Sequence, residues 1–353
     1  MKLPSLKIGE LTAKLPIIQG GMGVGVSRSK LAGSVAKEGG IGIISTAQIG
    51  FDEPDFETNT KEANLRSLEK HIKEAKKISN NGIIGINIMC VTNYYKETIK
   101  KAIDSGIDLI ISGAGLPKEL PKLVENTKVK IAPIISSARG AALMTKMWIS
   151  KYNYVPDMIV VEGPEAGGHL GFSRDELDNM KDTKLNIYDI VKEVSSKIKE
   201  FEEKFKKKIP IIAAGGIFDN KDIQKSIENG ASGVQIASRF VATHECDANI
   251  KFKQAYVNAK EEDVQIVQSP VGMPGRAIRN KFIENVKNTG RPIKCLGCIK
   301  TCNPKETPYC ITKALINSVR GNLDEGLIFC GSNVGRIDRI VSVKELMNEL
   351  AVG

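Results

Sequence analysis

The chain of 353 residues lacks any uninterrupted apolar run approaching the roughly 18 residues that a membrane span needs. Its N-terminal segment has no continuous apolar stretch of the kind that directs secretion, and seven cysteines are too few for a disulfide scaffold in a chain of this length. Aromatic residues make up only 5% of the sequence, which leaves little for stacking nucleic-acid bases. We therefore expect a cytoplasmic protein with reduced thiols that binds neither a membrane nor nucleic acid.

Positive charge is present in excess, and most of it is concentrated in one segment. Fifty-one Lys and Arg residues against 41 Asp and Glu residues give a net charge of +10. Between Arg276 and Lys305 there are eight basic residues and one acidic residue, Glu284, so this segment alone contributes +7. Such a run is typical of a solvated basic face, and it also fits an acidic partner or an anionic ligand.

Eight short apolar segments recur along the first 240 residues or so, and each is bounded by Gly, Pro, Ser or Asn. Segments with helical spacing separate them, as between Ile187 and Phe205. Eight alternations predict a (β/α)8 TIM barrel rather than a doubly wound sheet, which usually has five or six strands. The predicted strands are Pro16–Gln19, Ile41–Ser45, Ile83–Met89, Leu109–Ser112, Lys130–Ser136, Met158–Glu162, Ile209–Ala214 and Gly233–Ala237.

The rest of the chain carries no second set of alternating strands and helices. We expect residues 1–242 to form the barrel and residues 243–353 to form a helical, cysteine-bearing extension packed on it. A closing helix is predicted at Val343–Leu350.

Glycine-rich ends of the predicted strands indicate where a ligand would bind, because barrel enzymes place their sites at the carboxyl ends of the strands. Gly215-Gly216 follows the seventh strand, and Gln235–Ser238 belongs to the end of the eighth. Glycine has no Cβ, so backbone N–H groups there can approach a phosphate. We predict a phosphate site ahead of a short helix, with two ordinary turns as the alternative. The Gly21–Gly25 loop lacks the dinucleotide-binding spacing and fits a surface for a flat ring.

Histidine is scarce, and only one of the three has a context that indicates chemistry. His169 lies in the glycine-rich loop that runs from Glu162 to Gly171 at the predicted barrel mouth. An imidazole there could exchange a proton near neutral pH. We expect His71, on a lysine-rich helix, to be solvated, and we assign no role to His244.

Taken together, these motifs resemble the nitronate monooxygenase family and the related FMN-dependent enoyl-acyl-carrier-protein reductases. The resemblance runs in order from about Pro16 to Asn280. The matching segments are Ile18–Met22, Asn87–Met89, Ser112–Gly115, Glu162–His169, Ala214–Ile217 and Val234–Phe240.

The resemblance implies an FMN-binding barrel in which His169 is the catalytic histidine. It implies that the FMN phosphate lies on the Gly215-Gly216 and Gln235–Ser238 loops, with the isoalloxazine ring near Met22. This chain has Glu162 where the family often has Gln, and Ala237-Ser238 where it often has Gly-Thr. The residues expected at the cofactor are Gly20, Gly21, Met22, Asn87, Glu162, Gly167, Gly215, Gly216, Gln235, Ile236, Ala237 and Ser238.

The residues after Gly21-Met22 favour the monooxygenase branch, because this chain lacks the Trp that the reductases tend to have there. The implied reaction is oxidation of an alkyl nitronate by FMN and O2 to a carbonyl compound and nitrite, with a protonated His169 holding the anion. The alternative is an NAD(P)H-dependent enoyl-acyl-carrier-protein reductase, in which the basic segment would bind an acidic carrier protein. A non-catalytic flavin- or phosphate-binding barrel is the third interpretation, and a homodimer is an open alternative.

Four cysteines stand within sixteen residues in the pattern Cys-x2-Cys-x3-Cys-x7-Cys. Four such thiols could hold zinc or an iron–sulfur cluster, although the spacing matches neither standard pattern. Reduced cysteines packed against the barrel are the alternative. The candidate ligands are Cys295, Cys298, Cys302 and Cys310.

Overall fold

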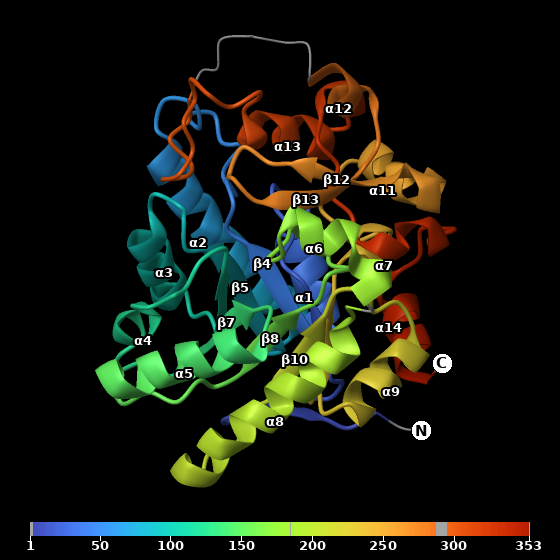
Figure 1. Ribbon diagram of the computed structural model, residues 1–353. Helices are drawn as coiled ribbons and strands as arrows, with labels where there is room; N and C mark the ends of the chain where they lie inside the picture. The colour runs from blue at the N-terminus through green and yellow to red at the C-terminus, as the bar shows by residue number, and fades with distance from the viewer. Residues whose placement is uncertain (1–2, 184, 287–294, 353) are drawn as a thin grey trace.

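The computed structural model describes residues 3–183, 185–286 and 295–352, and its centre is a closed barrel of eight parallel strands (Figure 1). The strands follow one another around the barrel in the order β10-β11-β3-β4-β5-β6-β7-β8. All eight predicted strands are present, with ends that differ by two residues at most. They are β3 (Ile17–Gln19), β4 (Ile41–Ser45), β5 (Ile83–Met89), β6 (Leu109–Gly113), β7 (Lys130–Ile135), β8 (Ile159–Glu162), β10 (Ile211–Ala214) and β11 (Gly233–Ile236).

Branched apolar side chains fill the inside of the barrel. Ile18, Ile43 and Val160 are completely buried in one cluster there. The strands read as continuous apolar segments because their other face is covered by helices. A short hairpin of β1 (Leu6–Ile8) and β2 (Leu11–Ala13) adds its apolar residues to the same cluster.

The helices around the barrel begin and end where local sequence dictates. The predicted long helix after the sixth strand is α8, and it ends at Lys206, which adopts the left-handed conformation. Likewise α2 ends at Asn80, also left-handed. The bounds are α1 (Ser29–Lys37), α2 (Thr60–Ser79), α3 (Tyr95–Asp104), α4 (Leu120–Leu123), α5 (Ala138–Tyr152), α6 (Arg174–Asp178), α7 (Met180–Thr183), α8 (Ile187–Phe205), α9 (Asn220–Glu228) and α10 (Ser238–Val241).

The extension after the eighth strand contains helices, as predicted, and in addition a hairpin that was not predicted. In Figure 1 the hairpin, α12 and α13 lie together beyond one end of the barrel, and α14 packs beside α1 and α9. The elements are α11 (Ile250–Asn258), a 3-10 turn (Glu261–Asp263), β12 (Val264–Gln268), β13 (Pro274–Ile278), α12 (Lys281–Val286), α13 (Ile311–Val319), two further 3-10 turns (Leu323–Glu325 and Ser332–Arg336) and α14 (Val343–Val352).

The hairpin joins the barrel through a third strand, β9 (Gly168–His169), which lies within the glycine-rich loop after β8. His169 pairs with Gly275 and Gly168 with Arg276, in antiparallel register. The loop that the sequence places at the barrel mouth is therefore held by residues about a hundred positions later in the chain.

One prediction about an exposed side chain is wrong. His71 is only 8% exposed, because it packs behind α1 and its Nδ1 lies 3.0 Å from the Ser29 hydroxyl. Burial lowers the pKa of His71 to about 4. The described part of the basic segment is mostly a solvated face, as predicted, because Arg279, Lys281, Lys300 and Lys305 are exposed, although Arg276 is only 5% exposed. Three further basic residues of that segment, Lys287, Arg291 and Lys294, lie outside the described residues.

Within the described part of the chain, no helix combines the length and apolar character needed to cross a bilayer.

Candidate active site

A cavity of about 290 Å³ lies at the carboxyl ends of the barrel strands, under the extension. The structure brings all the predicted cofactor residues and His169 together in its lining. From the barrel these are Gly20, Gly21, Met22, Asn87, Glu162, Gly167, His169, Gly215, Gly216, Gln235, Ile236, Ala237 and Ser238.

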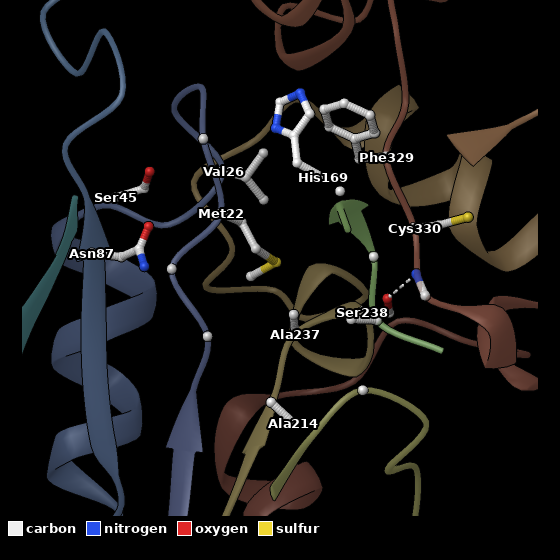
Figure 2. Close-up of a pocket in the computed structure, with 18 of the residues that line it drawn as sticks. Met22, Val26, Ser45, Asn87, His169, Ala214, Ala237, Ser238, Phe329 and Cys330 are labelled. Carbon is white, nitrogen blue, oxygen red and sulfur yellow. Dashed lines mark hydrogen bonds between the residues drawn. The ribbon is translucent and has the colours of Figure 1, made fainter. Parts of the chain in front are cut away.

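The cavity has two chemically different ends. Figure 2 shows His169 and Phe329 at one end, and Ala214, Ala237 and Ser238 at the other. Met22 lies between them in this view, with its side chain pointing into the space. One end of the cavity is therefore aromatic, and Met22 makes the middle apolar. The other end, called the polar end below, has small side chains and the Ser238 hydroxyl.

The Gly215-Gly216 turn needs glycine for its own packing, whereas the approach of a phosphate to it stays a prediction. Both residues have positive φ angles, +91° and +81°, which residues with a Cβ rarely adopt. A Cβ on Gly215 would stand 2.7 Å from the backbone nitrogen of Ala166, and one on Gly216 would stand 2.5 Å from the Glu165 carboxylate. The two glycines therefore allow β10 to pack against the loop after β8.

The helix that follows this turn, α9, is capped by its own residues. Asp219 caps α9, accepts a hydrogen bond from the Asp222 backbone at 3.1 Å, and forms a capping box with that residue. The short helix after β11, α10, carries no side-chain cap at its N-terminal boundary, Ala237, and the phosphate site ahead of it stays a prediction.

A segment of the extension covers the polar end of the cavity. The Ser238 hydroxyl accepts a hydrogen bond from the Gly331 N–H at 2.8 Å, as the dashed line in Figure 2 shows. The Asn333 amide donates to the Gly216 carbonyl at 2.9 Å. Sequence reasoning missed Gly331 and Asn333, because nothing in their local pattern indicates which strands they cover.

Two guanidinium groups lie beside the same end. Arg239 and Arg336 stack on the Phe218 ring, at 4.4 and 4.0 Å from its centroid. Arg239 lines the cavity and pairs with Glu349 at 2.8 Å, while Arg336 pairs with Asp219 at 2.8 Å. This end of the site is therefore surrounded by balanced charge rather than by a free cation.

The Met22 loop is fixed by its own hydrogen bonds and by close packing. The Met22 N–H donates to the Ser27 hydroxyl at 2.8 Å, and the Ser27 N–H donates to the Met22 carbonyl at 3.0 Å. A Cβ on Gly21 would stand 2.4 Å from the Cβ of Asn87. Gly21 thus lets the loop lie directly on β5, which exposes one side of Met22 to the cavity.

His169 is held by two residues of the extension. Its Nε2 lies 2.7 Å from the Ser269 hydroxyl, and its ring packs edge-on against Phe329 at 5.0 Å between centroids. Burial lowers the pKa of His169 to about 4. The imidazole is therefore neutral at pH 7 in the free protein, whereas the predicted imidazolium belongs to the state with an anion bound.

Glu162, at the end of β8, is another titratable group in the lining of the cavity. Burial raises the pKa of its carboxyl to about 7, against smaller opposing effects of the Gly171 N–H and of Arg276. The Gly171 N–H donates to one carboxyl oxygen at 3.1 Å. Arg276 is directed elsewhere, because it donates to the carbonyls of Pro164 and Ala166 at 2.8 and 2.5 Å. Near neutral pH this carboxyl can therefore hold or release a proton.

The four candidate metal ligands lie outside this cavity. In the parts of the chain that the structure describes, no three His, Cys, Asp or Glu side chains already form a ligand set for a metal ion. The four cysteines are not joined in disulfides.

Comparisons with known proteins show which proteins this chain resembles. A probable nitronate monooxygenase of Staphylococcus saprophyticus is 26% identical over 307 residues, covering 81% of both chains. One of Bacillus subtilis is 24% identical and covers 95% of this chain and 94% of its own.

Among solved structures, FabK from Thermotoga maritima aligns with a TM-score of 0.73 and 25% identity, covering 96% of this chain and 92% of that one. A nitroalkane oxidase from Streptomyces ansochromogenes aligns with a TM-score of 0.70 over 96% of this chain and 95% of that one, and its 17% identity shows a shared fold. The family model described as nitronate monooxygenase matches residues 5–353, and the chain belongs to that family.

Proposed function

We propose that the protein is an FMN-dependent oxidoreductase that oxidises alkyl nitronates with O2 to a carbonyl compound and nitrite. The observation that carries this proposal is the single cavity in which the Gly215-Gly216 turn, Met22 and His169 meet. Membership of the nitronate monooxygenase family supports it.

The residues present fit FMN. The small side chains of Ala214 and Ala237 leave open space at the end of the cavity next to Ser238, where the Ser238 hydroxyl would contact the phosphate. Met22 would lie against the flat ring, because its flexible thioether adapts to an aromatic face. When bound, FMN would supply the electron-accepting group that the side chains of this protein lack.

The polypeptide would bind and orient the substrate. A nitronate is an anion, and its oxygens need hydrogen-bond donors inside a cavity that excludes water. The Ser269 hydroxyl fixes one nitrogen of His169, which leaves the other ring nitrogen to donate to such an oxygen. An anion bound there would also raise the pKa of the imidazole, so substrate binding would favour uptake of a proton.

Parallel anaerobic reductions test this function. The FMN-loaded protein is mixed with a nitronate, with NADH or with NADPH, and bleaching of the flavin spectrum is followed. Fast bleaching by the nitronate alone, followed by nitrite release when O2 is admitted, is the expected result. No bleaching by any of the three would contradict an oxidoreductase of either kind.

The reductase of enoyl-acyl-carrier-protein substrates is the second candidate, and the similarity to FabK favours it. Under this alternative an acidic carrier protein would approach the exposed Lys300 and Lys305 near the cavity. Rapid bleaching by NADH or NADPH, with none by the nitronate, would establish it in place of the monooxygenase.

A further inference from the structure

The wall of the cavity next to His169 comes largely from the extension, and its side chains are apolar. Phe329 contacts the His169 ring, at 5.0 Å between their centroids (Figure 2). Leu315 of α13, Leu327 and Met89, which ends β5, also line the cavity and pack in the same apolar cluster as Phe329. We call these four residues the apolar wall. A substrate bound at His169 therefore has hydrocarbon side chains beside it.

Phe329, the part of the apolar wall that contacts His169, is fixed through both its backbone and its ring. The Tyr256 hydroxyl donates to the Phe329 carbonyl, and Phe329 forms an antiparallel bridge with Ala277. A Cβ on Gly275 would stand 2.8 Å from the Phe329 ring, so the ring lies directly on the backbone of β13. The wall is therefore formed before a ligand arrives, which lowers the entropy cost of binding.

The hydroxyl groups that line the cavity beside the apolar wall already donate to backbone carbonyls. The Thr92 hydroxyl donates to the Met89 carbonyl at 2.9 Å, and the Ser318 hydroxyl donates to the Leu315 carbonyl at 2.9 Å. Tyr256, which also lines the cavity, donates to the extension as described above. Because a hydroxyl carries one proton, none of the three has a second one to offer a substrate.

The charged side chains of the described lining give no support to a second anionic group on a substrate. They are Arg239, Glu162 and Glu165. The Arg239 guanidinium is paired with Glu349 at 2.8 Å, and the two carboxyl groups offer an anion no attraction. A carboxylate at the far end of a substrate would therefore lose its hydration here without gaining a partner.

We propose that the substrate carries an uncharged, apolar chain beyond the group that binds at His169, and that Leu315, Leu327 and Phe329 determine this specificity. The inference rests on the proposed function for one point, namely that the nitronate group binds at His169. The preferred substrates are then nitronates with an alkyl chain of several carbons, and nitronates that end in a second acidic group are rejected. Each methylene that the wall buries should strengthen binding about fourfold.

Steady-state kinetics of the FMN-loaded enzyme with a series of nitronates tests the specificity. From the nitronate of nitroethane to that of nitrohexane, we expect kcat/KM to rise by about fourfold per methylene until the wall is covered. A matched nitronate, in which a carboxylate replaces the terminal methyl of the nitrobutane compound, should react at least about 10²-fold less efficiently. Equal or better turnover of the carboxylate compound would overturn the proposal.

Binding of unreactive carboxylates makes the test independent of the reaction. A carboxylate has a planar pair of anionic oxygens, as a nitronate has, so butyrate, hexanoate and adipate can serve as probes in calorimetric titrations at constant pH. Hexanoate should bind roughly tenfold more tightly than butyrate, and adipate, with its second charge, at least about 10²-fold more weakly than hexanoate. Hexanoate that binds no better than butyrate or adipate would overturn the proposal.

The two measurements also separate this inference from the proposed function. If the carboxylates discriminate as expected but no nitronate bleaches the flavin, the oxidation of nitronates fails and the chain specificity stands. If nitronates are oxidised regardless of a second charge, the oxidation stands and the chain specificity fails.

A substitution in the apolar wall should change the preference in a defined direction. Leu315 is half-buried in the lining, so Leu315→Arg places a guanidinium beside the substrate chain. We expect the ratio of adipate to hexanoate affinity to rise at least about tenfold, since the second carboxylate gains an ion pair. Leu143→Arg is the matched control, because Leu143 is 49% exposed on α5, outside the cavity lining, and should leave the ratio unchanged. An unchanged ratio in Leu315→Arg would remove Leu315 from the specificity, and if this variant does not fold, the titrations of the unaltered protein decide.

Discussion

The two sides of the cavity differ in how their residues come together. The barrel side consists of strand ends, such as Met22 after β3 and Gly215 after β10, which the closed sheet brings to one rim. The opposite side consists of Ser269, Phe329 and the 331–333 segment of the extension, which contact the strand ends across long stretches of sequence. Under the proposed function the barrel side would carry the surface for the cofactor, and the extension would position the histidine.

Removing the histidine should have the largest effect, because it is where the two sides meet. We expect His169→Ala to lower turnover by about 10²–10³-fold through loss of a preorganised hydrogen-bond donor. FMN content should not change, since the polar end of the cavity is untouched. Steady-state kinetics with flavin quantification checks this, and turnover equal to that of the unaltered enzyme would remove His169 from the catalytic residues.

A substitution on the barrel side should instead weaken FMN binding and lower the stability of the fold. Gly215→Val places a branched side chain at a φ of +91° and against the Ala166 nitrogen, so the turn must shift. We expect a loss of stability of roughly 1–3 kcal/mol and weaker FMN binding. Thermal unfolding and flavin titration measure the two effects. Full flavin content at limiting FMN would show that the phosphate does not bind at this turn.

Changing the hydroxyl that orients the histidine should have a smaller effect than removing the histidine. Ser269→Ala deletes the 2.7 Å contact to Nε2, and we expect turnover to fall by about tenfold, in line with one hydrogen bond. Its matched comparison is Ser269→Thr, which retains the hydroxyl and should recover most of the loss. If both variants behave alike, the extension does not orient His169 through this contact.

The smallest effect is expected in the pH dependence of kcat/KM. This measurement distinguishes the titration of Glu162 from that of His169. The pKa of Glu162 is raised to about 7 and that of His169 is lowered to about 4, so between pH 5.5 and 8 the free enzyme should titrate at Glu162. Glu162→Gln should flatten the kcat/KM profile in that range, whereas His169→Asn should keep its shape at a lower level. If His169→Asn flattens the profile and Glu162→Gln keeps its shape, the group that titrates in this range is His169 rather than Glu162.

The same carboxyl gives a stability prediction with a definite sign. A folded pKa above the unfolded value means that Glu162 costs stability as the pH rises above about 4.5, and the cost is complete above pH 7. Glu162→Gln should therefore stabilise the protein at pH 8 relative to pH 5, by up to ~3 kcal/mol. Urea unfolding at both pH values tests this.

The comparison of the two sides also explains what sequence reasoning could and could not predict. Strands such as Ile41–Ser45 are continuous apolar segments bounded by turn residues, and their number alone indicates a closed barrel that gathers their ends. The motif residues were placed in the cavity for that reason. Ser269 and Phe329 carry no such signal, because the long-range pairing of β9 with β13 determines where they lie.

The hairpin itself had a local signal that the helical interpretation passed over. Val264, Ile266 and Val267 are β-branched residues in a segment of five, and Pro270 and Gly272 follow it as turn residues. No local sequence signal indicated that His169 would be neutral, because its neutral state follows from burial by residues remote in sequence.

Flavin content tests the central claim most directly, because every assignment on the barrel side assumes that the cavity holds FMN. The purified chain should be yellow, and denaturation should release about one FMN per chain that comigrates with an FMN standard. Flavin-free protein should regain the same content when it is reconstituted with FMN. A colourless protein that takes up no FMN would contradict the account of the site.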